Sequence, residues 1–82
     1  MVISLRFGDY LERYLVDNSY SITIKNNSVH IINYLELEDF SSTRVVVRYE
    51  SGKTILLGTD LVVSKMQEDE LLIIGNIKTI EV

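Results

Sequence analysis

The residues best suited to chemistry are one histidine and two acidic clusters. His30 is the only histidine, and the clusters are Glu36 with Glu38 and Asp39, and the run of residues 68–70. Carboxylates that lie close together can serve general acid–base catalysis or bind a divalent cation. A small hydrolase or metal enzyme would therefore have to be built from Glu36, Glu38 and His30.

Other features argue against catalysis. The chain has no cysteine, which excludes Cys-ligated zinc and a cysteine nucleophile. A serine nucleophile needs a base and an orienting group, and His30 alone would have to supply the base. The four glycines are isolated, so the sequence has no glycine-rich phosphate loop. We therefore expect no enzyme activity, no catalytic residue, no metal, no cofactor and no small-molecule substrate, with both acidic clusters solvated.

The charge balance bears on the class of partner. Eight basic and twelve acidic residues give a net charge of −4, which disfavours nucleic acids and anionic membranes because both attract cationic surfaces. The five tyrosines could stack on bases, so a small β-barrel of the Sm or OB type that binds nucleic acid is the alternative hypothesis. Protein partners are the primary expectation.

The first 19 residues show a helical period. Phe7, Tyr10, Leu11, Tyr14 and Leu15 follow the i, i+3, i+4, i+7, i+8 spacing of one apolar stripe. This spacing predicts a short amphipathic helix over residues 4–17. Such a short helix is marginal alone and must dock its stripe on the rest of the chain.

From residue 20 onward the period changes from 3.6 to 2, as in β-strands. Nineteen Val and Ile residues with no Ala and no Pro also favour strands. Turn signals recur at short intervals, with a break expected at residues 58–60. We predict a mainly β fold, an antiparallel meander of about 6–8 short strands forming a small sandwich or roll. Residues 1–82 are expected to form a single domain, with the helix in 1–19 and the meander in 20–82.

Two apolar runs do not alternate. One is Val45, Val46 and Val47, and the other is residues 71–74, which include Leu72 and Ile74. A strand buried on both faces has this pattern. Either both runs are central strands of a closed monomer, or a partner covers one face. These five residues are therefore the candidate interface, for self-association or for a protein partner.

The order of the strand and turn signatures in residues 21–82 carries a further signal. The matching positions are Ile22, Ile24, residues 29–34, Phe40, Ser41, Tyr49, Gly52, Ile55, Leu57, Gly58, residues 61–63, Met66, residues 70–73, Gly75, Ile77 and Ile80. Together they resemble the YabP/YqfC family of sporulation proteins of endospore-forming bacteria, with spacing closest to the YqfC branch. Family members often have Gly in the first turn and near position 36, where this chain has Asn26-Asn27 and Glu36.

The resemblance implies a role in spore formation. It implies a non-enzymatic structural or assembly module at the developing spore envelope or coat, working with itself or with a sporulation membrane protein. The expected location is the cytoplasm of the mother cell, peripheral to the spore surface. This expectation agrees with the sequence, which has no run of about 18 apolar residues and no signal-peptide pattern in residues 1–5.

Overall fold

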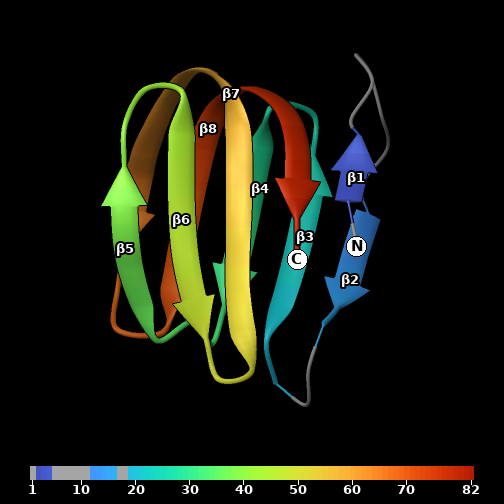
Figure 1. The fold of residues 1–82 in the computed structure, drawn as a ribbon, viewed down its shortest axis with the longest axis vertical. Helices are drawn as coiled ribbons and strands as arrows, with labels where there is room; N and C mark the ends of the chain where they lie inside the picture. Colours follow the sequence, from blue (N-terminus) through green and yellow to red (C-terminus); the bar gives the residue numbers. More distant parts are fainter. Residues whose placement is uncertain (1, 5–11, 17–18) are drawn as a thin grey trace.

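Eight strands form the described part of the chain in a computed structural model (Figure 1). The structure describes residues 2–4, 12–16 and 19–82, and the side chains of residues 15, 16 and 19–82. The strands are β1 (Val2–Ser4), β2 (Glu12–Leu15), β3 (Ser21–Lys25), β4 (Ser28–Ile32), β5 (Glu36–Phe40), β6 (Arg44–Tyr49), β7 (Gly52–Met66) and β8 (Glu70–Glu81). No helix that could cross a membrane is found among these residues.

All strand pairs are antiparallel and belong to one open sheet, in the order β2-β3-β4-β8-β7-β6-β5, with β1 also paired to β8. The long strands β7 and β8 form a hairpin that pairs from Ile55 with Glu81 to Met66 with Leu71. The start of β7 pairs with β6, whereas the start of β8 pairs with β4. The hairpin therefore belongs to two layers. The first layer contains β5, β6, the start of β7 and the end of β8, and the second contains β2, β3, β4, the start of β8 and the end of β7.

The hairpin folds over on itself where its pairing is irregular. Register shifts lie between Leu57 and Gly58 and between Thr59 and Val62. Gly75 has a φ of +139°, and Asp60 has a φ of +55°, so both lie where most side chains are strained. A Cβ on Gly58 would overlap the Asn76 carbonyl oxygen, and one on Gly75 would lie 2.5 Å from the Asp60 oxygen. The two backbones thus touch directly at the bend.

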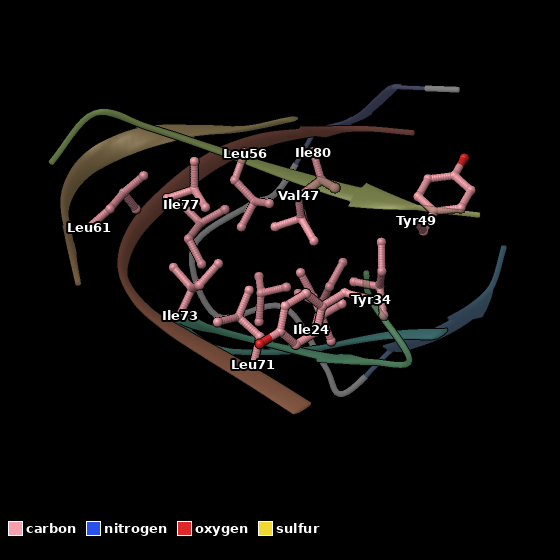
Figure 2. Close-up of a cluster of buried hydrophobic side chains, with 14 of the residues drawn as sticks. Ile24, Tyr34, Val47, Tyr49, Leu56, Leu61, Leu71, Ile73, Ile77 and Ile80 are labelled. Atoms are coloured by element: carbon pink, nitrogen blue, oxygen red, sulfur yellow. The ribbon is translucent and has the colours of Figure 1, made fainter. Parts of the chain in front are cut away.

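The core fills the space between the two layers (Figure 2). Alternation along each strand sends one side chain in two inward. The fully buried large apolar side chains are Ile22, Ile24, Val29, Ile31, Val45, Val47, Leu56, Leu71, Ile73 and Ile80. Tyr20, Tyr34 and Tyr49 belong to the same cluster, and Figure 2 shows Tyr34 and Tyr49 at one end of it.

The predicted mainly β, antiparallel fold is confirmed. The prediction that residues 58–60 separate two strands was wrong. β7 continues through these residues as a single strand from Gly52 to Met66. β8 likewise continues through Gly75 and Asn76. Gly and Asp residues commonly mark the end of a strand because they weaken its pairing. Here they lie where β7 and β8 bend, and the two strands remain paired on both sides of the bend.

The predicted N-terminal helix is not present in the described residues. Residues 12–15 form strand β2, which pairs with β3 from Glu12 opposite Ile24 to Leu15 opposite Ser21. The prediction was wrong there because pairing with β3 supplies backbone hydrogen bonds that a short, marginal helix cannot match. Ser4, the expected start of the helix, ends strand β1. Residues 5–11 and 17 of the predicted helix lie outside the described residues.

The bend gives a first prediction. Gly58→Ala and Gly75→Ala should each lower the free energy of unfolding by about 2–3 kcal/mol, because each added Cβ meets backbone that cannot move alone. Urea unfolding measures the change. Gly52→Ala is the matched control, since its Cβ would meet only the Tyr49 side chain, 3.2 Å away at the hydroxyl. Equal losses at all three glycines would contradict this account of the bend.

Candidate functional site

A pocket of about 290 Å³ lies at the end of the molecule where four chain connections meet. It is lined by Ser19, Tyr20, Asn33, Tyr34, Leu35, Glu50 and Asp69. These residues come from the β2–β3, β4–β5, β6–β7 and β7–β8 connections, which all lie at the lower end in Figure 1. Residues 50 positions apart in the sequence therefore share one site.

Asn33 ties three of these connections together. Its backbone N–H donates to the Asp69 carbonyl oxygen at 2.7 Å, and its side-chain amide donates to the Ser19 carbonyl oxygen at 2.7 Å. Its φ of +66° is a conformation that Asn tolerates better than most residues. The Tyr34 hydroxyl donates to the Gln67 carbonyl oxygen at 2.5 Å. The pocket is therefore held in shape by hydrogen bonds before anything binds.

One lining residue, Tyr20, stacks on the neighbouring Tyr49. The Tyr20 and Tyr49 rings lie 4.2 Å apart at 11°, and the Tyr20 hydroxyl is 2.7 Å from the Thr54 hydroxyl. Tyr20 and Thr54 are both buried. Burial raises the pKa of Tyr20 to about 12, since removal from water disfavours the phenolate. The neutral Tyr20–Thr54 pair therefore stays hydrogen-bonded throughout the physiological pH range.

The rim of the pocket is acidic. Glu50 and Asp69 are exposed, and neither forms an ion pair with a side chain of residues 15, 16 or 19–82. Burial, with the neighbouring Asp69 carboxylate, raises the pKa of Tyr34. The site thus combines free carboxylates with aromatic and apolar walls, a combination that suits an amine or guanidinium carried on an apolar stem.

His30 belongs to a different cluster, on the outer face of the second layer. Its Nε2 lies 2.7 Å from a Glu70 carboxylate oxygen that also accepts from Lys65 Nζ at 3.1 Å. The hydrogen bonds from His30 and Lys65 lower the pKa of Glu70. Glu70 comes from the acidic run that the sequence indicated was solvated, but its carboxylate is engaged on the sheet face.

The acidic cluster at residues 36–39 lies in the other layer. Glu36 pairs with Arg48 at 3.0 Å, Glu38 with Lys53 at 3.2 Å, and Asp39 with Arg44 at 3.5 Å. The structure does not bring Glu36 and Glu38 together with His30, because β5 and β4 belong to different layers. Within residues 15–16 and 19–82, no group of three metal-ligating side chains is present.

The five candidate interface residues divide into two groups. Val45, Val46 and Val47 are all buried within the chain. Val45 and Val47 point into the core, so Val46 faces the opposite side of β6, between Asp39 and Ile55 of the neighbouring strands. Leu72 is half-buried, and Ile74 is 40% exposed. Only Leu72 and Ile74 thus retain surface that a partner could reach, and their role in an interface stays a prediction.

The pocket is not predicted by the sequence. Asn33 and Glu50 carry no motif, and Asp69 was interpreted as part of a solvated turn. The available signal was that polar residues follow the ends of several predicted strands, at residues 33, 50 and 69. Turning this into a site requires the strand order, which local patterns do not contain.

The buried tyrosine pair yields a second prediction. Tyr20→Phe and Thr54→Val should each cost about 1–2 kcal/mol of unfolding free energy, because each leaves a buried hydroxyl without its partner. The double variant should cost less than the sum by about 1 kcal/mol, measured as a double-mutant cycle. Tyr34→Phe combined with Thr54→Val is the control and should be additive, because Tyr34 bonds elsewhere. Additivity of both pairs would contradict the coupling.

The Glu70 cluster predicts an acid-dependent loss of stability. A lowered carboxyl pKa stabilises the fold above the ordinary value of 4.5, and this contribution disappears as the pH falls through the lower folded value. The melting temperature of Glu70→Gln should therefore fall less on acidification than that of the wild type. Glu68→Gln, on the same turn, is the control and should follow the wild type. Parallel pH profiles for wild type and Glu70→Gln would refute the assignment.

Comparisons with known proteins place the chain in a family. The model of the YabP family matches residues 17–82, which include the pocket and both layers except β1 and β2. No curated protein matches the chain, and no solved structure does. Because the match covers most of the sequence and the whole of β3 to β8, this protein belongs to the YabP family.

Proposed function

We propose that the protein is a non-enzymatic assembly module of the developing spore envelope. The observation that carries the proposal is the match of the YabP family model to residues 17–82, since membership of this family suggests a sporulation-related role. The proposed location is the mother-cell cytoplasm, peripheral to the spore surface. The proposed partners are further copies of the chain and a sporulation membrane protein, as the resemblance to the YqfC branch implies.

The structure supports a scaffold role through its rigidity and its surface. Both layers share one hairpin, and the loops at the pocket end are cross-linked by Asn33 and Tyr34. On the outer face of the first layer, Arg44, Arg48 and Lys53 are each paired with an acidic residue. Such a module offers a fixed surface on which these three cations are already paired.

The absence of enzyme activity is part of the proposal. It is supported by where the candidate catalytic groups lie. His30 is engaged by Glu70 on the second layer, and Glu36 and Glu38 are engaged by cations on the first. General acid–base catalysis requires its groups within hydrogen-bond reach of one substrate, and these groups face away from one another.

A nucleic-acid-binding barrel is the weaker alternative. It would need a cationic face with exposed aromatic rings. Tyr20, Tyr34 and Tyr49 are instead buried in the core, and the pocket beside them carries free carboxylates. Salt-sensitive retention of single-stranded RNA in a filter-binding assay would favour this alternative over the assembly role.

The decisive experiment is genetic. Deletion of the gene in its endospore-forming host should leave vegetative growth unchanged and strongly reduce the count of heat-resistant spores. A wild-type copy should restore the count, and a fluorescent fusion should concentrate around the developing spore. A copy that encodes the destabilised Gly75→Ala variant should restore the spore count less well, because less folded protein is present. The level of the variant in the cell is measured alongside the count. Normal spore counts after deletion would refute the proposed function.

A further inference from the structure

We propose that copies of this protein associate end to end, with Lys25 of one copy entering the pocket formed by Glu50 and Asp69 of the next. This inference deepens the proposed function, on which it rests for its biological setting. It names the surface and the occupant through which the module assembles. It starts from the charged side chains that have no ion pair among the described side chains.

The pocket carries unneutralised negative charge in a preformed depression. The acidic residues with ion pairs in the described chain are Glu36, Glu38, Asp39 and Glu70, all in strands. Glu50 and Asp69 have none and line the same 290 Å³ pocket. Asp60, Glu68 and Glu81 also lack ion pairs there, but none of them lines the pocket. The pocket is thus where free charge coincides with a cavity.

The walls of the pocket fit a lysine side chain. Tyr34 and Leu35 supply an aromatic and an apolar surface beside the two carboxylates. A lysine packs its methylene stem on such surface while its ammonium reaches acceptors. Aromatic rings add an attraction for a cation near their faces. Leu35 is 56% exposed in the isolated chain, so the stem would also cover apolar surface.

Among the described side chains, Lys25 is a cation without an ion pair at the end of the molecule opposite the pocket. Arg44, Arg48, Lys53 and Lys65 are each paired with an acidic residue, whereas Lys25 and Lys78 have no ion pair with the side chains of residues 15, 16 and 19–82. Lys78 lies inside β8, but Lys25 is the last residue of β3 and is exposed at a hairpin. It therefore lies at the tip of the β3–β4 hairpin, on the outward side of β3.

The hairpin that carries Lys25 is fixed in position. The Lys25 carbonyl oxygen accepts from the Ser28 hydroxyl at 2.8 Å, and the Asn27 carbonyl oxygen accepts from Gly75 N–H at 3.0 Å. The second bond ties the tip to the bend of β8. Less conformational freedom is then lost on association, which favours binding.

Lys25 and the pocket of the same copy lie too far apart to meet, so the proposed contact is between two copies. The pocket residues Ser19 and Tyr20 precede β3, and Lys25 ends it, so tip and pocket lie at opposite ends of that strand. Figure 1 shows the β3–β4 hairpin at the upper end of the longest axis, which measures 30 Å, and the four connections that carry the lining residues at its lower end. One copy cannot fill its own pocket. A contact between two different surfaces on opposite ends is heterologous, and it propagates as an open chain unless the rotation closes a ring.

A charge exchange tests the proposal. The wild type should show a sedimentation coefficient that rises with concentration at low salt and returns to the monomer value at high salt. Lys25→Glu alone, and Glu50→Lys with Asp69→Lys, should each weaken association at least about tenfold. An equimolar mixture of these two variants should recover it, because each then offers the charge that the other lacks.

Controls make the result specific. Lys78→Glu changes the net charge by the same amount away from the tip and should associate like the wild type. Thermal melting checks that each variant is folded. Amide shifts on dilution of the labelled wild type should move at the pocket and at the β3–β4 hairpin, which tests the contact without any substitution.

Several outcomes would overturn the inference. These are a wild type that stays monomeric at every concentration, Lys25→Glu that associates normally, or a mixture that fails to recover association. Butylammonium that shifts the pocket resonances of a strictly monomeric wild type would assign the pocket to the cation of another partner. These tests use purified protein, so their failure would leave the spore phenotype intact. A missing spore phenotype with intact self-association would instead refute the proposed function alone.

Discussion

The whole structure depends on the direct contact between two backbones at the bend of β7 and β8. One hairpin supplies strands to both layers, so the layers are joined through two continuous, paired strands. The bend requires backbone approach at Gly58 and Gly75 that a side chain would prevent. Because 82 residues bury only a small core, this covalent link between the layers contributes what a larger apolar interior would otherwise provide.

The bend also decides where the turns lie. Once β7 and β8 fold over, the connections at Ser19, Asn33, Glu50 and Asp69 gather at one end, and the β3–β4 hairpin and the bend itself gather at the other. The pocket is therefore a consequence of the topology, in which loops distant in sequence complete one depression. Asn33 then stabilises the depression by bonding to two of those loops.

The sequence predicts the periodic parts of this fold well. Alternation identified the strands from Ser21 to Tyr49, and the run of three valines correctly indicated a strand buried on both faces. Prediction from the sequence pattern was wrong where contacts between distant segments determine the local structure. The stripe containing Leu15 has helical spacing, yet β3 offers that segment a pairing partner. The pocket could not be predicted for a related reason. The proximity of Glu50 and Asp69 depends on the strand order, which residue spacing does not encode.

The distribution of charge connects the fold with assembly. On the faces, acidic and basic side chains meet across neighbouring strands, as Glu36 does with Arg48, and exposed pairs of this kind contribute little to stability. What they do is remove net charge from the faces. Among the described side chains, Glu50 and Asp69 have no ion pair and lie on connections at one end, whereas Lys25 has none and ends strand β3 at the other. The proposed end-to-end contact would use these two ends and leave the paired faces outside it, so the sheet that builds the fold would also set the direction of the proposed assembly.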